Sequence, residues 1–423
     1  APSGSTPVNK VVLYSTTNST TFCYSTSVES AFAMEEEDEK PGSGDQEVAQ
    51  ELESENKEVE PRDLPLYEVE VPEALKRGEN VVFTIHTTIP ANQKGYIVLR
   101  QFEDLEWLHH NLVTANNIEG VIIPPLPVKP LSDPKSAESL SRRQLGSNTK
   151  VLRGDQFEQD CKSVQKYLQL MLSHRIFGID KNLAKFMTDE EAPVRARLNK
   201  GLMTRLTSAI ENARKGGHKD VNEYFGGQRN FASEFSKFVK EASLNYNKML
   251  VAQLRLSNSY RLLATELTSC TAERDEGLVK LNRILKLLSD ACEDEATCYE
   301  LKSGQSELTV GFFLDLFARY SDSLKEMHFR RTSALIEYEA CEKAVEKAKP
   351  VKKAAAEEAF EAAKKSFENS SEVGKKEINT FTQLRLLSAS EEMAKYAEQQ
   401  MKVSQDFYSQ LFQSRKALLE MQL

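Results

Sequence analysis

The stretch that decides the fold reads LRQFEDLEWL over residues 99–108 and resumes as VIIPPLPVKP over residues 121–130. Its first part predicts the end of a strand, with Arg100 pointing outward, and then a helix in which Leu105 and Leu108 share one face. Its second part cannot join the centre of a sheet, because proline has no amide proton and favours polyproline II. A strand, a helix and a proline-rich segment in this order predict a folded module, with the prolines in an internal loop or, alternatively, as an exposed ligand for an SH3-type domain.

Strand patterns precede this stretch. Apolar residues alternate over residues 67–71, turn residues fill positions 77–80, and β-rich runs follow over residues 81–86 and 96–102. Three strands in meander order are the economical interpretation. We also expect Asp104 to cap the helix that follows the third strand.

Helical spacing recurs over residues 156–172 and again over residues 183–187. Three strands packed by these helices predict an α+β module over residues 64–190. Beyond it, apolar stripes at helical spacing run over residues 231–267 and 278–338, and a third begins after Pro350. Helices of this length find no partner within a small globule, so residues 219–423 are expected to form an all-α, elongated antiparallel three-helix bundle.

The formal net charge of −9 is concentrated in one segment. Thirteen acidic residues but only three basic residues lie between Met34 and Asp63, which leaves the rest of the chain close to neutral. Low hydrophobicity and high charge predict that residues 1–63 form a disordered acidic tail. Residues 1–33 are rich in Ser and Thr, and we expect them to be a non-native extension that precedes a natural start at Met34.

Several classes of function lack support in the sequence. The six cysteines form no CxxC pair and have no histidine at metal-ligand spacing, so we expect reduced thiols and no metal site. No Gly-rich phosphate loop, nucleophile elbow or paired-acid arrangement stands out, so we expect neither an enzyme nor a cofactor. No run approaches the length of a transmembrane helix, and no nucleic-acid partner is expected.

Two segments could contact a membrane. Leu202, Leu206 and Ile210 share one face of an amphipathic helix in a linker, residues 191–218, and this helix could lie on a membrane or dock on a neighbouring domain. Lysines also cluster around the expected bend at Pro350, namely Lys343, Lys347, Lys349, Lys352 and Lys353. They could form a basic tip that faces an anionic membrane surface, or a solvated face in which glutamates pair with lysines.

Residues 100–108, together with residues 123–129 and the later Tyr167-Leu168, resemble the phox-homology (PX) domain. A PX domain followed by long helices is similar to a sorting nexin of the PX-BAR class. Residues 329–339 and 343–348 look like the subgroup that contains sorting nexins five, six and thirty-two. The resemblance implies a peripheral coat protein of early endosomes that scaffolds curved tubules, sorts cargo for retrograde transport to the Golgi and forms a heterodimer with another PX-BAR sorting nexin.

The lipid pocket implied by the resemblance is degenerate. It would comprise Arg100, Gln101, Phe102 and Lys129, but PX domains that bind 3-phosphoinositides carry an arginine where this chain has Gln101. A second lipid-binding arginine is expected where Asp160 stands, and a carboxylate repels phosphate. The resemblance therefore implies weak or absent binding to 3-phosphoinositides.

The resembled subgroup also captures the cytoplasmic tails of cargo receptors, which add as strands beside a helical insertion after the proline run. Here that insertion, residues 131–156, is short, and the groove would depend on Phe157 and the neighbouring strand edge. An alternative from another class is a cytoskeletal or motor adaptor whose bundle binds protein and never touches lipid.

Overall fold

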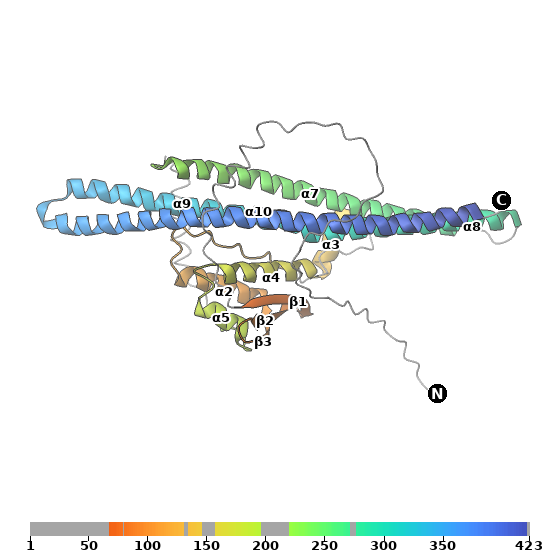
Figure 1. Ribbon diagram of the computed structural model, residues 1–423, viewed down its shortest axis with the longest axis horizontal. Coiled ribbons are helices and arrows are strands. Elements are labelled where there is room, and N and C mark those ends of the chain that lie inside the picture. Colours follow the sequence, from red (N-terminus) through yellow and green to blue (C-terminus); the bar gives the residue numbers. More distant parts are fainter. Residues whose placement is uncertain are drawn as a thin grey trace, which may run out of the picture. The chain divides into compact units, whose positions relative to one another are not determined.

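The computed structural model describes residues 67–78, 80–130, 134–145, 157–195, 220–270 and 276–420. The chain divides into residues 1–63, which lie outside the described residues, and a second compact unit, residues 64–423. This second unit contains a three-stranded sheet with short helices, followed by a set of much longer helices (Figure 1).

The sheet is an antiparallel meander of β1 (Glu68–Arg77), β2 (Asn80–Ile89) and β3 (Lys94–Gln101). Arg77 pairs with Asn80 across a two-residue turn in which Gly78 has a φ of 64°, a conformation that glycine adopts without strain. The register of β1 shifts between Glu70 and Glu73, where one extra residue forms a bulge. The three predicted strands and their order are confirmed.

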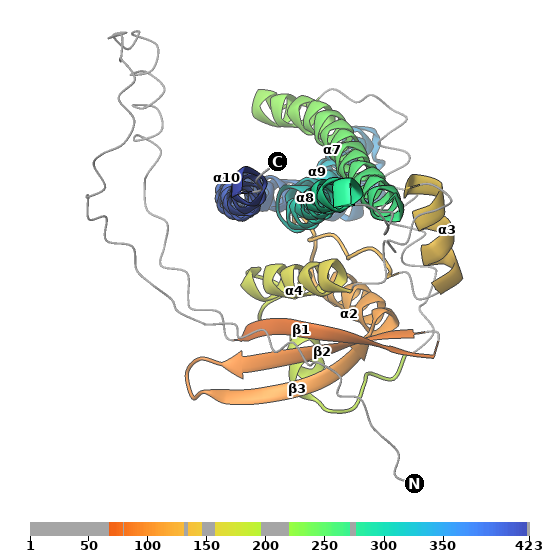
Figure 2. The same cartoon turned by 90° about the vertical axis from the view of Figure 1, so that its right-hand side faces the viewer.

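Helices cover one face of this sheet (Figure 2). The predicted helices are present as α2 (Phe102–Ala115), α4 (Glu158–Ser173) and α5 (Lys181–Thr188). A further helix, α3 (Pro134–Leu145), lies in the insertion and contacts the bundle helix α7. The helix α3 was not predicted, because its mostly polar residues show no apolar stripe.

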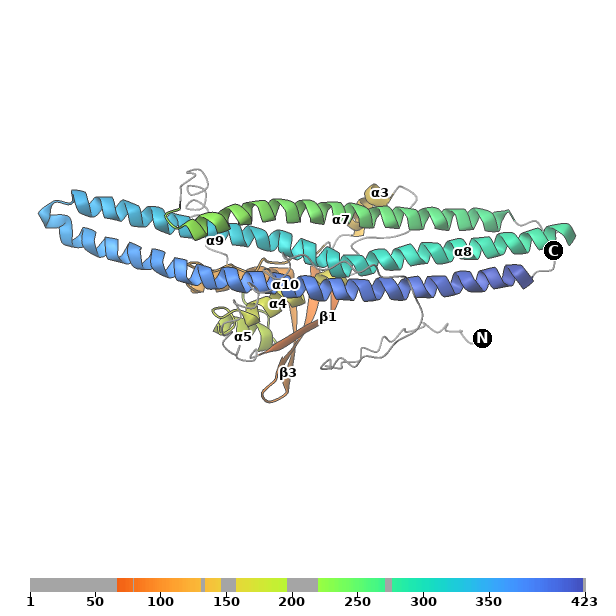
Figure 3. The same ribbon diagram turned by 45° about the horizontal axis from the view of Figure 1, so that its top comes forward.

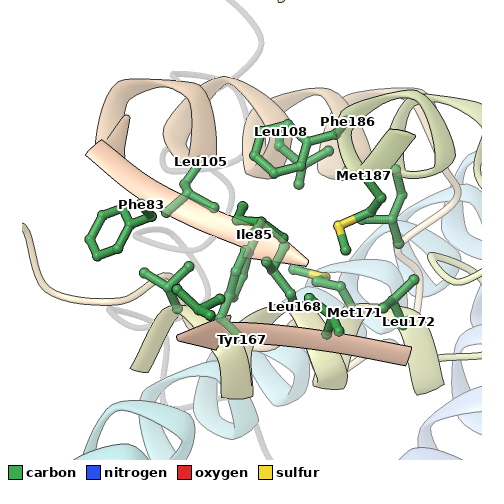
Figure 4. Close-up of a cluster of buried hydrophobic side chains, with 14 of the residues drawn as sticks. Phe83, Ile85, Leu105, Leu108, Tyr167, Leu168, Met171, Leu172, Phe186 and Met187 are labelled. Carbon is green, nitrogen blue, oxygen red and sulfur yellow. The ribbon is translucent and has the colours of Figure 1, made fainter. Parts of the chain in front are cut away.

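The core of this α+β module lies between the sheet and the helices. Figure 4 shows its central side chains, which come from β2, α2, α4 and α5. The labelled residues are Phe83, Ile85, Leu105, Leu108, Tyr167, Leu168, Met171, Leu172, Phe186 and Met187. Burial of apolar side chains from all these elements is the main force that holds the short helices on the sheet.

Three long helical segments form the predicted bundle (Figure 3). The first is α7 (Glu223–Ser269), and the third is α10 (Lys353–Glu420). The second runs through α8 (Glu276–Ser306), a π-helical turn η1 (Glu307–Gly311) and α9 (Phe312–Lys347). A short 3-10 turn, η2 (Pro350–Lys352), connects α9 to α10 at the predicted bend. The sequence did not indicate the π-helical turn.

The segment around the start of the proline run is bound to the bundle. Glu377 of α10 accepts a hydrogen bond from the Ile122 amide at 3.1 Å, and Arg319 of α9 donates to the Leu126 carbonyl at 3.1 Å. Gly120 approaches α10 so closely that a Cβ atom there would lie 2.4 Å from the Ser370 carbonyl oxygen. The proline run is therefore an internal loop, and its interpretation as an exposed ligand is wrong.

None of the described helices combines the length and the apolar character that crossing a membrane requires.

Candidate functional site

Arg100 lies inside the α+β module, and the expectation that it points outward is wrong. Its side chain is fully buried. Residues alternate along β3 so that Val98 and Arg100 both face the core, opposite Ile85 and Phe83 of β2. Phe102, the first residue of α2, is buried in the same core. Neither Arg100 nor Phe102 is therefore available to a lipid headgroup in this conformation.

The guanidinium of Arg100 binds main-chain carbonyl groups at the end of α5. Its Nε donates to the Phe186 carbonyl at 3.1 Å, and its Nη atoms donate to the carbonyls of Asp189 and Glu190. The last carbonyls of a helix have no partner within the helix and carry partial negative charge, so a buried cation is favourable there. Burial lowers the pKa of Arg100, while nearby carboxylates, Asp189 among them, raise it. Arg100 thus has a structural role.

Gln101 is engaged by another part of the same chain. The main-chain N–H of Gln101 donates a hydrogen bond to Asp104 Oδ2 at 2.7 Å, which confirms that Asp104 caps α2. Arg195 donates from Nε to Asp104 Oδ1 and from Nη2 to Gln101 Oε1, each at 2.8 Å. The position at which PX domains carry a phosphate-binding arginine is therefore filled by a hydrogen bond to an internal arginine.

Lys129 is also paired. Its ammonium lies 2.7 Å from Glu103 Oε1, and this hydrogen bond raises the pKa of Lys129. The hydrogen bond to Asp104 raises the pKa of Arg195, and Glu103 and Glu106 raise it further. The two cations, Lys129 and Arg195, thus face the three carboxylates of Glu103, Asp104 and Glu106. This corner of the module therefore offers no net positive charge to a phosphate group.

The position of the second expected arginine carries a negative group. Asp160 lies in the first turn of α4, and burial raises the pKa of its carboxyl to about 6. This carboxyl is still largely ionised near neutral pH, so it cannot replace a guanidinium.

A pocket opens between the edge strand β1 and the first turns of α4. Its volume is about 490 Å³. Phe157, which precedes α4, forms part of its wall and packs against the core of the module. The full lining comprises Val71, Pro72, Glu73, Ala74, Phe157, Glu158, Cys161, Lys162 and Gln165. The predicted combination of Phe157 with a strand edge thus exists in the structure.

Two glutamines of α4 cover one half of the edge of β1. The Val71 amide donates to Gln165 Oε1 at 2.9 Å, and Gln169 Nε2 donates to the Val69 carbonyl at 3.5 Å. These amide side chains satisfy the main-chain groups that a neighbouring strand would otherwise bind. Any added strand must therefore pair with β1 beyond the bulge.

Lys162 connects the pocket to the bundle. Its stem lines the pocket, while its ammonium donates to the Leu308 carbonyl of η1 and to Glu392 of α10, the latter at 2.9 Å. The ammonium also lies 4.5 Å from the centre of the Phe312 ring. Burial lowers the pKa of Lys162, and Glu392 raises it. Lys162 therefore helps to hold the α+β module on the bundle.

The predicted basic tip is exposed at the bend between α9 and α10. The five lysines, Lys343, Lys347, Lys349, Lys352 and Lys353, are all solvent-exposed. Among the described residues, an ion pair involving this set is formed by Lys353 with Glu357, at 3.9 Å. Val351, which lies between Lys349 and Lys352 in the sequence, is 96% exposed. The end of the bundle thus combines exposed lysines with an exposed apolar residue.

The bundle also leaves large apolar side chains uncovered on α7, α8 and α10. They include Phe238, Leu244, Leu262, Leu263, Val279, Leu288, Leu386, Leu387, Met401, Tyr408, Phe412 and Leu419. Apolar side chains exposed in such number along three long helices favour association of these helices with a partner.

The amphipathic residues Leu202, Leu206 and Ile210 lie outside the described residues. Conversely, sequence reasoning missed Arg195, Glu103 and Lys162. Each acts through a partner that is distant in the sequence, and no local pattern marks it.

A model of the PX domain family matches residues 90–190. Human sorting nexin-6 is 25% identical over 361 residues, which cover 79% of this chain and 87% of that protein. Mouse sorting nexin-32 is 23% identical over 365 residues, which cover 80% and 89%. The cryo-EM structure of the SNX-BAR Mvp1 tetramer has the same fold, with a TM-score of 0.52 at 11% identity, over 81% of this chain and 99% of that one. In sequence and in fold the chain resembles the PX-BAR class of sorting nexins.

The resemblance that the sequence suggested is thereby confirmed, as is the fold class. The α+β module is the PX domain, and the long helices form the BAR bundle.

Proposed function

We propose that this PX-BAR sorting nexin coats curved tubules of early endosomes from the cytoplasmic side and sorts cargo for retrograde transport to the Golgi. The observation that carries the proposal is the exposed basic tip at the end of the BAR bundle. It is combined with a PX domain in which residues of the same chain already bind Gln101 and Lys129 of the lipid pocket. In this protein the bundle tip provides the membrane contact, and the PX domain binds protein.

The basic tip supplies the attraction to an anionic surface. Each lysine near such a surface contributes about 1 kcal/mol, so the attraction of the five lysines together is several times the thermal energy RT. The apolar apex, Val351, can enter the interface between the lipid headgroups. Leu202, Leu206 and Ile210 of the linker, residues 191–218, are proposed as a second membrane contact.

The PX domain is proposed to bind 3-phosphoinositides weakly or not at all. Arg100 is buried, and Gln101 and Lys129 are engaged by Arg195 and Glu103. A phosphate group would have to displace these hydrogen bonds and approach an excess of carboxylates, and both steps cost free energy.

The pocket between β1 and α4 is proposed to receive the cytoplasmic tails of cargo receptors. Phe157 gives it an aromatic wall, and β1 is an edge strand. An extended peptide that adds to such an edge gains main-chain hydrogen bonds, while the pocket holds one of its side chains.

The partner is proposed to be another PX-BAR sorting nexin. The apolar side chains left uncovered on α7, α8 and α10 support this, because a second bundle would bury them. The mass of the protein in solution, alone and mixed with candidate sorting nexins, tests it: a mass that stays monomeric with each candidate would contradict the proposal.

Cosedimentation with liposomes tests the membrane contact. The vesicles contain phosphatidylcholine and phosphatidylserine, with or without phosphatidylinositol 3-phosphate. The tip variant replaces Lys347, Lys349, Lys352 and Lys353 by glutamine, and we expect it to lose most of the binding, by about 10²-fold or more. Adding the 3-phosphoinositide is expected to change binding little in either protein.

A matched variant separates the tip from net charge. It replaces four exposed bundle lysines outside the tip, Lys375, Lys376, Lys402 and Lys416, by glutamine and should bind liposomes far better than the tip variant. Equal loss in both variants would place the contact elsewhere. Absence of binding by the unmodified protein would favour the cytoskeletal or motor adaptor instead.

A further inference from the structure

We propose that the pocket between β1 and α4 selects peptide strands in which a lysine or arginine lies on the same face as an apolar side chain. This inference rests on the proposed peptide capture and adds the chemistry of the peptide that fits. It follows from the charges around the pocket, from the partner of its one cation and from the part of the strand edge that remains free.

The lining combines an apolar wall with carboxylates. Pro72, Ala74 and Phe157 contribute apolar surface, and the two anionic residues, Glu73 and Glu158, are both exposed. An apolar side chain of a peptide would rest on the wall while a neighbouring cation meets Glu158 at the mouth. Glu73 adds negative charge from the other face of the sheet, where its Oε1 accepts a hydrogen bond from Thr84 Oγ1 at 3.3 Å.

The one cation among the lining residues does not neutralise these carboxylates. Lys162 turns its ammonium toward Glu392 and the Leu308 carbonyl of the bundle, so its charge is already matched outside the pocket. A peptide carboxylate would have to compete with Glu392 for it and would approach Glu158 at the same time.

The thiol inside the pocket reports the same electrostatic environment. Burial raises the pKa of Cys161 to about 12, and the carboxylates of Asp160, Glu158 and Glu73 add to this effect because they disfavour a second negative charge nearby. Burial disfavours a charge of either sign, but the part of the effect that comes from the three carboxylates disfavours an acidic peptide and favours a cationic one.

The free part of the strand edge fixes where the peptide runs. Arg77 and Asn80 close a two-residue hairpin, so they form a hydrogen-bonded pair, and every second residue back from Arg77 also bonds to β2. The main-chain groups of Ala74 and Lys76 therefore point away from β2. The glutamines of α4 cover Val69 and Val71 but not this segment. A strand paired with Ala74 and Lys76 passes directly beside Glu73 and the pocket mouth.

Three synthetic peptides test the inference with the full-length chain. The first is acetyl-Thr-Phe-Thr-Lys-Thr-Val-Thr-amide, in which Phe, Lys and Val share one face of a strand. The other two replace its lysine by glutamine or glutamate. Competition with a fluorescent copy of the first peptide measures the three affinities at low and high salt. We expect the lysine peptide to bind about threefold to tenfold more tightly than the glutamine peptide, with the glutamate peptide weakest and the differences smaller at high salt.

Variants assign the preference to the pocket. Glu158→Gln should reduce the preference for lysine, and Glu158→Lys should reverse it toward the glutamate peptide. Glu106→Gln, an exposed glutamate on α2, is the matched control and should leave the preference unchanged. Phe157→Ala should weaken all three peptides together, because it removes the apolar wall.

The outcomes separate this inference from the function on which it rests. Equal binding of the three peptides, all weakened by Phe157→Ala, overturns the charge preference and leaves peptide capture standing. Failure of every peptide to bind at millimolar concentration, or binding that Phe157→Ala does not change, overturns peptide capture at this pocket and the preference with it.

Discussion

Replacing Arg100 by methionine is expected to destabilise the PX domain strongly, although PX domains that bind lipid use an arginine in this region for the headgroup. Methionine keeps an unbranched apolar stem but lacks the guanidinium group, and with it every donor and the charge. The carbonyls of Phe186, Asp189 and Glu190 would then lose their shared partner inside the domain.

The magnitude follows from the contacts. Hydrogen bonds that involve a charged group contribute about 1.5–3 kcal/mol each, and these contributions do not add fully. Removing one partner from a fully buried charged network costs about 3–5 kcal/mol. Because the side chain of Arg100 is entirely inaccessible, solvent cannot replace the lost donors without local opening. We therefore expect a loss of about 3–5 kcal/mol.

Urea unfolding of the full-length chain, together with amide hydrogen exchange over residues 186–190, measures this loss. Exchange in that segment should accelerate most, because its carbonyls hold α5 against β3. Lys129→Met is the matched control: its side chain is 61% exposed, and the change should cost no more than about 1 kcal/mol. The reasoning is refuted if Arg100→Met unfolds at the same urea concentration as the unmodified protein while losing binding to phosphatidylinositol 3-phosphate.

Two further changes probe the bundle and its contact with the PX domain. Gly120→Ala should cost about 2–4 kcal/mol and expose residues 118–126 to hydrogen exchange, because the new Cβ would lie 2.4 Å from the Ser370 carbonyl oxygen and the backbone has a φ of 72°. Gly78→Ala, whose Cβ would meet no atom within 4 Å at a φ of 64°, should cost only about 1 kcal/mol of backbone strain, and equal losses in urea unfolding would contradict the packing argument. Burial lowers the pKa of His328 from 6.5 to about 4, so the folded state resists its protonation, and up to about 3 kcal/mol of stability is lost as the pH falls from 6.5 to 4. His328→Phe should reduce the difference between urea midpoints at pH 7.5 and pH 5, and an unchanged difference would show that other groups dominate.

Local patterns in the sequence predicted the elements of this fold well. The alternation over residues 67–71, the glycine turn at Gly78 and the apolar stripes after residue 230 each depend on neighbours within a few positions, and the structure has the corresponding strands, hairpin and long helices. The bend at Pro350 was predictable for the same reason, since proline cannot continue a helix.

The candidate sites were only partly predictable. Phe157 was expected beside a strand edge, and the pocket contains it, but the glutamines that cover half of that edge gave no signal. The π-helical turn at residues 307–311 and the helix α3 were also missed, because neither changes the hydrophobic pattern that sequence reasoning uses.

The sequence by itself determined the three strands, the helices that carry apolar stripes, the resemblance to PX-BAR sorting nexins and the loss of an arginine at Gln101. Only the tertiary structure decided that Arg100 is buried and that Lys162 binds the bundle. Arg100 meets the Phe186 carbonyl 86 residues further along the chain, and Lys162 meets Glu392 after 230. Local periodicity determines which face of an element is apolar, but the partner of a charged side chain depends on which distant segment folds against it.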